Sequence, residues 1–243
     1  MPIRVLGINS SPRRTGGTSA LLAVALEAAR AEGATTEVLH LADLNLRPCE
    51  GCVSEDELKC RYPCPIEDDG RKLYEALLRS HGIVVATPIY WFNVSGLLKN
   101  AIDRMTVLEN MLHFDGRSWL EGKVCGFIAI GSDAGAIAVI QNLMAVFNSF
   151  GALIPPWALA YHESPSSPLA NRKALLDAAN VGRVVVLAAR MLNEGERAPR
   201  TWYRADPEYL RLLDEIVAKV GAEHKVLKMS ETSCYPALSE VRT

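Results

Sequence analysis

The sequence of 243 residues is 49% hydrophobic and 22% charged, which is enough apolar material for a full core without disulfide or metal support. The formal net charge of −2 and the absence of a Lys/Arg run exclude the electrostatic pattern of a nucleic-acid-binding protein. Because no segment has the roughly 18 consecutive apolar residues of a membrane helix and the first residues lack a signal-peptide pattern, we expect a cytoplasmic protein that acts on small molecules, with no membrane partner.

Apolar runs of strand length alternate with stretches of helical spacing, which is the pattern of βαβ units around a parallel sheet. The first helix is expected to follow Thr18 and Ser19 as N-caps and to end at Gly33. Strands are expected, in chain order, at residues 3–8, 36–41, 82–86, 123–130 and 152–160. Further helices are expected across residues 73–78, 97–108, 140–147 and 168–193, with one more after Pro207.

Five strands with crossing helices predict an α/β fold of the flavodoxin-like, doubly wound type, with a five-stranded parallel sheet of order 2-1-3-4-5 and helices on both faces. Residues 1–200 are expected to form this domain, with an insertion at residues 42–66, and residues 201–243 to form a C-terminal helix and tail extension. In such folds the ligand binds beyond the carboxyl ends of the strands. The loops after strands one, three and four are therefore the candidate site.

Loop one, residues 9–18, reads Asn-Ser-Ser-Pro-Arg-Arg-Thr-Gly-Gly-Thr and leads from the first strand into the first helix. Backbone N–H groups, hydroxyls and two guanidinium groups gather where the helix dipole favours an anion, which indicates a phosphate site. The loop has neither the GxGxxG spacing of a dinucleotide site nor the GK[ST] of a P-loop, so a nucleoside triphosphate is not indicated. The alternative is an ordinary hydroxyl-capped helix with a glycine-rich turn.

Loop three, residues 87–95, follows the third strand and contains three consecutive aromatic residues, Tyr90, Trp91 and Phe92. Such side chains suit a flat conjugated ring, because stacking contributes about 0.5 to 1.5 kcal/mol beyond area burial. Alternatively, they close the core or a subunit interface. Loop four, residues 131–135, offers backbone N–H groups ahead of a helix, either for the polar edge of the same ring or as a simple connecting turn.

Residues 11–19, SPRRTGGTS, resemble the SPRxxGNTS loop of the NAD(P)H-dependent FMN reductase superfamily. Residues 87–91, TPIYW, followed by residues 96–104, GLLKNAIDR, resemble its second signature. The spacing agrees across about residues 1–160, and Gly17 stands where the family usually has Asn. The cysteine pattern is similar to that of the iron-sulfur flavoproteins and their relatives.

The resemblance implies FMN as cofactor and NAD(P)H as co-substrate, and it assigns three groups of residues to the flavin. They are Ser11, Arg13, Gly17, Thr18 and Ser19 for the phosphate, Pro88, Ile89, Tyr90, Trp91 and Phe92 for one side of the ring, and Gly131, Ser132 and Gly135 for its far side. No catalytic acid or base is implied, since hydride transfer between nicotinamide and flavin is the cofactor's own chemistry.

Four of the six cysteines fall within the insertion at residues 42–66, which we call the cysteine loop, in the order Cys49-x2-Cys52-x7-Cys60-x3-Cys64. In a chain without an export signal, metal ligation or reduced thiols are favoured over disulfides. By the resemblance the four thiolates hold a [4Fe-4S] cluster, with Cys60 replacing a third cysteine whose usual position is occupied by Glu55. Zinc or free thiols are the alternatives. We expect this loop to lie over the flavin side of the sheet, because it leaves the carboxyl end of the second strand.

Several other reactive residues receive no functional role. Cys125 lies in an apolar strand and is expected in the core. His113 and His162 are lone histidines, which are more often structural than catalytic. Packing or interface positions are expected for Trp119, Trp157 and Trp202.

The leading interpretation is an FMN-dependent NAD(P)H oxidoreductase that passes hydride from NAD(P)H to FMN and then to a quinone, flavin or other small acceptor. The alternative is an electron carrier of the flavodoxin or iron-sulfur flavoprotein type without its own nicotinamide site. A homo-oligomer, either dimer or tetramer, is expected because Trp91, Phe92 and a long irregular loop would expose a large apolar patch on a monomer.

Overall fold

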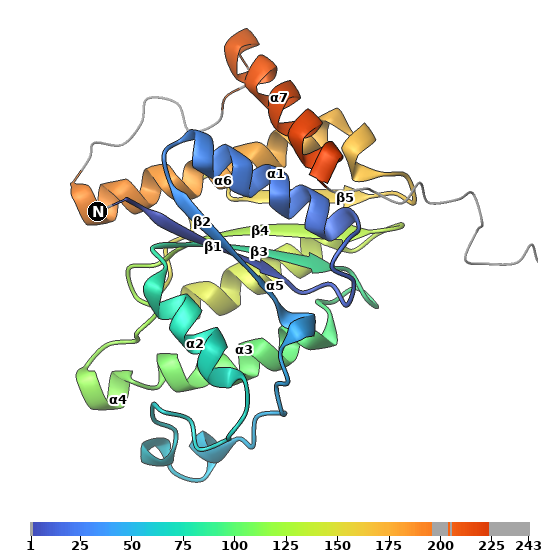
Figure 1. The fold of residues 1–243 in the computed structure, drawn as a ribbon. Helices are drawn as coiled ribbons and strands as arrows, with labels where there is room; N and C mark the ends of the chain where they lie inside the picture. The colour runs from blue at the N-terminus through green and yellow to red at the C-terminus, as the bar shows by residue number, and fades with distance from the viewer. Residues whose placement is uncertain (1, 196–203, 205, 224–243) are drawn as a thin grey trace, which may run out of the picture.

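The computed structural model describes residues 2–195, 204 and 206–223, and all statements below concern these residues. Five parallel strands form one sheet of order β2-β1-β3-β4-β5, which confirms the predicted topology. The strands are β1 Arg4–Asn9, β2 Thr35–His40, β3 Gly82–Pro88, β4 Val124–Gly131 and β5 Leu159–Glu163. Their carboxyl ends lie along the right-hand edge of the sheet in Figure 1.

Helices cover both faces of the sheet (Figure 1). One face carries α1 Gly17–Ala31, α6 Arg172–Glu194 and α7 Pro207–Glu223, and the other carries α2 Gly70–Arg79, α3 Gly96–Glu109 and α5 Ala136–Ser149. A short helix, α4 Leu112–Asp115, follows α3. In the described part of the chain, no helix combines the length and apolar character that crossing a bilayer requires.

Alternating side chains of each strand supply the two layers of the core, as the two-residue period of a strand requires. In β1, Val5 packs beneath α1 and α6, whereas Leu6 packs on the α2–α3 side. The α7 residues Tyr209 and Leu213 are fully buried in the same layer as α1 and α6. The helix that follows Pro207 is therefore part of the main core.

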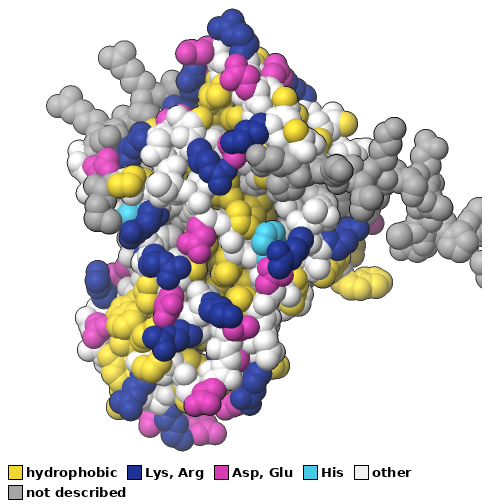
Figure 2. Space-filling model, in the orientation of Figure 1, with side chains coloured by type: hydrophobic (Ala, Val, Ile, Leu, Met, Phe, Trp, Pro, Cys, Tyr) yellow, Lys and Arg dark blue, Asp and Glu magenta, His cyan; other side chains and the backbone are white. Residues whose placement is uncertain are grey.

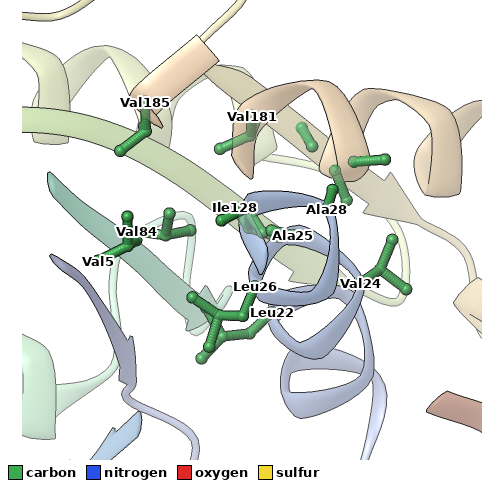
Figure 3. Packing of buried hydrophobic residues seen from close by; sticks show 14 of the residues in the cluster. Val5, Leu22, Val24, Ala25, Leu26, Ala28, Val84, Ile128, Val181 and Val185 are labelled. Atoms are coloured by element: carbon green, nitrogen blue, oxygen red, sulfur yellow. The ribbon is translucent and has the colours of Figure 1, made fainter. Parts of the chain in front are cut away.

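The crossing of α1 over α6 brings two backbones into direct contact at Gly182. A Cβ atom at this position would lie 1.8 Å from the carbonyl oxygen of Ala25, which is far inside van der Waals contact. Figure 3 shows Val181 and Val185 of α6 pointing toward the sheet and α1 around this crossing. Glycine is therefore required here for the close approach of the two helices.

The fifth strand lies later than predicted, since it covers Leu159–Glu163 rather than residues 152–160. Only Leu153 of the earlier stretch makes a bridge, to Val124. Pro155 and Pro156 have no N–H group to donate to a ladder, and Trp157 adopts a left-handed φ of 63°, so the chain turns before it can pair regularly.

The predicted N-caps of the first helix are also wrong. The structure has Gly16 at the cap of α1 with no side-chain cap hydrogen bond, and Thr18 and Ser19 lie buried within the first turn. At the other end the prediction is confirmed, because Gly33 has a φ of 84° directly after the helix and its N–H donates to the carbonyl of Arg30. The predicted helix at 168–193 is a 3₁₀ turn, Pro168–Ala170, followed by α6 with Asn171 as its N-cap. Trp202 and the tail after residue 223 lie outside the described residues.

Candidate functional site

Loops one, three and four meet at the carboxyl edge of the sheet. The Ser95 hydroxyl, at the end of loop three, donates to the carbonyl of Ser10 in loop one at 2.8 Å. The N–H of Ile89 in loop three donates to the carbonyl of Ile130, just before loop four, at 2.7 Å. The three loops singled out in the sequence therefore form one continuous surface.

The N-terminus of α1 differs from those of the other four helices that follow strands. Each of those helices has a side-chain acceptor for an N–H group of its first turn: Asp68 for α2, Ser95 for α3, Glu163 for α5 and Asn171 for α6. The first N–H groups of any helix have no intrahelical partner, and α1 has no side-chain cap. Its N–H groups are thus available to an external anion, favoured there by the helix dipole.

The charges around this N-terminus favour an anion as well. Arg13 and Arg14 are both exposed, and Arg14 pairs with Asp43 at 2.8 Å, whereas no ion pair of Arg13 occurs among the described residues. The Ser11 hydroxyl accepts from the N–H of Arg13 at 3.2 Å and so shapes the turn. The donor set of loop one, unpaired N–H groups beside one free guanidinium, matches what a phosphate monoester needs.

Gly17, which stands where the family usually has Asn, packs closely against the 3₁₀ turn that starts at Pro168. A Cβ atom at Gly17 would lie 3.1 Å from Cγ of Pro168 and 3.5 Å from Cγ2 of Ile130. The 3₁₀ turn that starts at Pro168 therefore occupies the space that a side chain at this position would use. The sequence contains no local signal for this contact, because the two residues are far apart in the chain.

Loop three forms a tight reverse turn around its aromatic residues. Tyr90 and Asn93 exchange two backbone hydrogen bonds of 2.9 and 3.0 Å, and the two residues between them, Trp91 and Phe92, have φ values of 52° and 60°. Both central residues of a type I′ turn need positive φ, which glycine and asparagine adopt far more easily than bulky residues. Such strain is concentrated at functional sites.

The turn presents its aromatic side chains to solvent. Trp91 is 95% exposed, Phe92 65% and Tyr90 45%. Figure 2 shows a hydrophobic side chain standing clear of the surface at the right-hand edge, the side on which the strands end. The loop thus offers planar groups at the same edge as the bare N-terminus of α1.

Loops three and four pack against each other through two glycines. A Cβ atom at Gly131 would lie 2.9 Å from Cδ1 of Ile89, and one at Gly135 would lie 3.0 Å from Cδ1 of Phe92. Gly135 also has a φ of 107°, in the region that favours glycine. Of the sequence-predicted ring residues, Ile89 and Phe92 therefore lie close to the backbone of loop four, and Ser132 is exposed.

The cysteine loop does not lie over the flavin side of the sheet, contrary to our expectation. It leaves β2 at the carboxyl edge and then runs below α2 and α3 (Figure 1). Its path follows α3 from end to end: Asn100 donates to the carbonyl of Leu46, and Asn110, just past the helix, donates to the carbonyls of Glu57 and Cys60, each at 2.7 or 2.8 Å. Because α3 runs back from the carboxyl edge, these contacts carry the cysteines away from loop three.

Three side chains of α3 and its C-terminus hold this loop through main-chain oxygen atoms. Besides Asn100 and Asn110, Arg104 donates to the carbonyl of Arg47 at 2.8 Å. The loop itself contains only short 3₁₀ turns, Leu41–Asp43, Cys52–Ser54 and Glu57–Lys59. Its fold therefore depends on α3 rather than on secondary structure of its own.

The four cysteines of the loop line one small recess of about 30 Å³ next to Arg104. All four are free thiols, with Cys60 buried and the other three partly buried. Burial, and next the neighbouring Cys52, raise the pKa of Cys60 to about 12, with smaller effects from Cys49 and Cys64. No three His, Cys, Asp or Glu side chains in the described part of the chain converge on a single metal-ion position.

The remaining reactive residues are structural. Cys125 is fully buried in β4, and burial raises the pKa of its thiol. His162 is 2% exposed, and its two ring nitrogens lie 3.0 Å from the carbonyl oxygen of Ser166 and 3.1 Å from Nδ2 of Asn171, which links β5 to the start of α6. His113 lies beside Glu57 of the cysteine loop at 3.5 Å, and Trp119 packs on Tyr62 with ring centroids 5.2 Å apart.

A family model described as NADPH-dependent FMN reductase matches residues 3–166. Iron-sulfur flavoprotein MJ1083 of Methanocaldococcus jannaschii is 36% identical over 148 residues, which are 60% of this chain and 72% of that protein. The structure of RosB with the bound intermediate 8-demethyl-8-formylriboflavin-5'-phosphate covers 99% of both chains with a TM-score of 0.67 and 20% identity. That of NAD(P)H:quinone oxidoreductase from Methanothermobacter marburgensis covers 75% of this chain and 96% of its own, with a TM-score of 0.56 and 15% identity.

The two solved structures are similar in fold alone at these identities. The family match is stronger evidence, because residues 3–166 include all three loops at the carboxyl edge and the whole cysteine loop. The resemblance found in the sequence is confirmed. The chain therefore belongs to the NADPH-dependent FMN reductase family, a family of FMN-binding flavoprotein oxidoreductases, and its relatives include iron-sulfur flavoproteins.

Proposed function

We propose that this protein is an FMN-dependent NAD(P)H oxidoreductase that passes hydride from NAD(P)H to FMN and then to a quinone, a flavin or another small acceptor. The observation that carries this proposal is the uncapped N-terminus of α1 beside Arg13, at the same edge as the exposed aromatic turn of loop three. The names of similar proteins, which include an NAD(P)H:quinone oxidoreductase and an NADH:FMN oxidoreductase, are consistent with this chemistry.

In this proposal the chain binds, orients and shields the cofactor. The phosphate is held by the N–H groups at the start of α1, by Arg13 and by the hydroxyls of Ser11, Thr18 and Ser19. The side chains of loop three support one face of the ring, and the backbone of loop four meets its polar edge. FMN, when bound, supplies the hydride chemistry, so no side chain is required as acid or base.

The cysteine recess is proposed to hold a [4Fe-4S] cluster through Cys49, Cys52, Cys60 and Cys64. The donor set fits, because four free thiols line one recess, and a cluster takes each thiolate at a separate iron atom. A single zinc ion would instead need all four sulfurs about 2.3 Å from one point. If the protein has no nicotinamide site, the same two groups would make it an electron carrier, which is the second candidate.

The FMN site is tested by Arg13→Ala with Arg14→Ala as its control. Loss of Arg13 is expected to weaken FMN binding by roughly 1.5 to 3 kcal/mol, the contribution of a hydrogen bond to a charged group. Arg14 already pairs with Asp43, so its removal should change the affinity much less. Titration of apoprotein with FMN measures both. Equal affinities for the wild type and the Arg13→Ala variant would contradict the assignment.

Bleaching of the flavin spectrum by NADH or NADPH under anaerobic conditions separates the oxidoreductase from the carrier.

We further propose that the protein is a homo-oligomer, a dimer or a tetramer, in which the exposed aromatic turn is covered. Trp91 at 95% exposure and Phe92 at 65% are unusual for large apolar side chains on a monomer. Sedimentation at micromolar concentration is expected to give the mass of a dimer or tetramer, and Trp91→Ser should shift the distribution toward monomer. A monomeric wild type would contradict this proposal.

A further inference from the structure

Arg104 is a buried cation beside the cysteine recess. Its side chain is 1% exposed, and all three nitrogens of the guanidinium group have acceptors. Nε donates to the Tyr74 hydroxyl at 3.1 Å, Nη1 to the carbonyl of Arg47 at 2.8 Å and to Asp68 at 2.5 Å. Nη2 donates to the other carboxylate oxygen of Asp68 at 3.0 Å and lies 3.7 Å from Sγ of Cys64. The guanidinium is thus aimed at a cysteine sulfur and is held there from several sides.

Asp68 fixes the orientation of this guanidinium. Its side chain is also 1% exposed, and it accepts from the N–H groups of Arg47 and Gly70, each at 2.8 Å, besides binding Arg104 through both oxygens. Burial opposes ionisation of this carboxyl, but the hydrogen bonds from Arg104 and from the two N–H groups outweigh burial and lower its pKa. Two opposite charges therefore lie side by side in a dry environment, where each has a strong influence on nearby groups.

The pair connects both ends of the cysteine loop to α3. Arg47 lies two residues before Cys49, and Asp68 lies four residues after Cys64. In contrast, Lys59, a cation of the cysteine loop, is half exposed and pairs with Glu55 at the surface. Arg104 is therefore the buried positive charge of this recess among the described residues, and solvent screens it far less than it screens Lys59.

We propose that Arg104 is a positioning residue that sets the reduction potential of the cluster at the cysteine recess, through its N–H···S bond to Cys64 and its buried charge, with Asp68 as the opposing charge. This inference rests on the cluster in the proposed function. A reduced cluster carries one more negative charge than an oxidised one. A hydrogen-bond donor or cation beside its sulfurs stabilises the reduced form and raises the potential, and a nearby anion lowers it.

The test compares Asp68→Asn, the double variant Arg104→Met with Asp68→Asn, and Lys59→Met, each as the full chain. Asparagine removes the negative charge and keeps one side-chain oxygen, which can accept from the N–H group of either Arg47 or Gly70, because these two groups bind different oxygens of Asp68. The double variant avoids leaving Asp68 buried without a partner, which a single Arg104 substitution would do at a large cost in stability. Lys59→Met removes one positive charge from the same loop at an exposed position.

The measurement is an anaerobic redox titration of protein reconstituted with ferrous iron and sulfide, followed by absorbance and electron paramagnetic resonance. At a fixed solution potential near the wild-type midpoint, the ratio of reduced to oxidised cluster is expected to rise at least threefold in Asp68→Asn. In the double variant the ratio of reduced to oxidised cluster is expected to be at least tenfold lower than in Asp68→Asn. A tenfold change in this ratio corresponds to about 59 mV for a one-electron couple. Lys59→Met should change the ratio of reduced to oxidised cluster less than twofold relative to the wild type.

Opposite shifts in the two variants support the inference, because a merely structural role would change iron content without moving the potential in opposite directions. Unchanged potentials in iron-loaded variants would overturn the inference and leave the proposed cluster intact. If the double variant does not fold, the direction of the shift in Asp68→Asn decides. A wild type that retains no iron would overturn both this inference and the proposed cluster, while the FMN titration judges the flavin site independently.

Discussion

The Gly182→Ala variant is expected to be less stable than the wild type by about 3 kcal/mol or more, the upper end of the usual cost of overpacking. The added methyl group would lie 1.8 Å from the carbonyl oxygen of Ala25, and the obstacle is backbone rather than a flexible side chain. Relief would require α1 and α6 to separate, and with them the core layer that both helices share. Urea denaturation followed by circular dichroism measures the difference.

Gly221→Ala in α7 is the matched control for this substitution. No atom lies within 4 Å of a Cβ at Gly221, so the same methyl group meets open space there. Alanine also has the higher helix propensity, and a gain of up to about 1 kcal/mol is expected, reduced by the position of Gly221 near the helix end. A Gly182→Ala protein within about 1 kcal/mol of the wild type would show that the crossing of α1 and α6 can relax.

The Ser19→Asp variant is expected to bind FMN more than 100-fold more weakly. Ser19 is buried in the first turn of α1, where the proposed phosphate would lie. Two like charges at about 4 Å repel by about 4 kcal/mol at the effective dielectric constant near a protein surface, and 2.7 kcal/mol already corresponds to a factor of 100. FMN titration of the apoprotein measures the loss, with the uncharged Ser19→Asn variant as the control.

The carboxylate introduced by Ser19→Asp should weaken FMN binding, but it should not lower the stability of the apoprotein. A negative charge in the first turn of an uncapped helix is favoured by about 0.3 to 1 kcal/mol. Apo Ser19→Asp is therefore expected to melt no lower than apo Ser19→Asn. If Ser19→Asp keeps wild-type affinity for FMN, the phosphate does not bind at α1, whatever the effect on stability.

The sheet order and the three loops at its carboxyl edge were predictable because they depend on local patterns. Apolar runs locate strands, and parallel strands joined by helices leave few topologies. The errors occurred where a local pattern competed with backbone constraints. Residues 152–158 are apolar enough for a strand, but two prolines and the left-handed Trp157 postpone β5 to Leu159. Thr18 and Ser19 are good capping residues, but the helix starts one residue before them, at Gly17.

The site could be predicted only in part, because its specificity depends on contacts between distant segments. Glu163, whose carboxylate accepts from the first N–H group of α5, lies 27 residues from its partner Ala136. Arg104 and Asp68 are 36 residues apart, and although Arg104 ends the second signature, nothing in the sequence shows that the two residues pair. The path of the cysteine loop along α3 depends on similar long-range hydrogen bonds, which explains why extrapolation from the end of β2 gave the wrong position.

The way in which α3 holds the cysteine loop makes that loop tolerant of change in its sequence. Asn100, Arg104 and Asn110 donate hydrogen bonds to main-chain carbonyl oxygens of the loop, which every amino acid possesses, and not to particular side chains. Residues between those whose carbonyl oxygens are bound can therefore be substituted. Inserted residues can also be accommodated as an outward bulge, while the hydrogen-bonded residues keep their positions. Residues 53–56, between Cys52 and Glu57, are such a stretch, so the same three amide and guanidinium side chains can accommodate recesses of different composition on an unchanged scaffold.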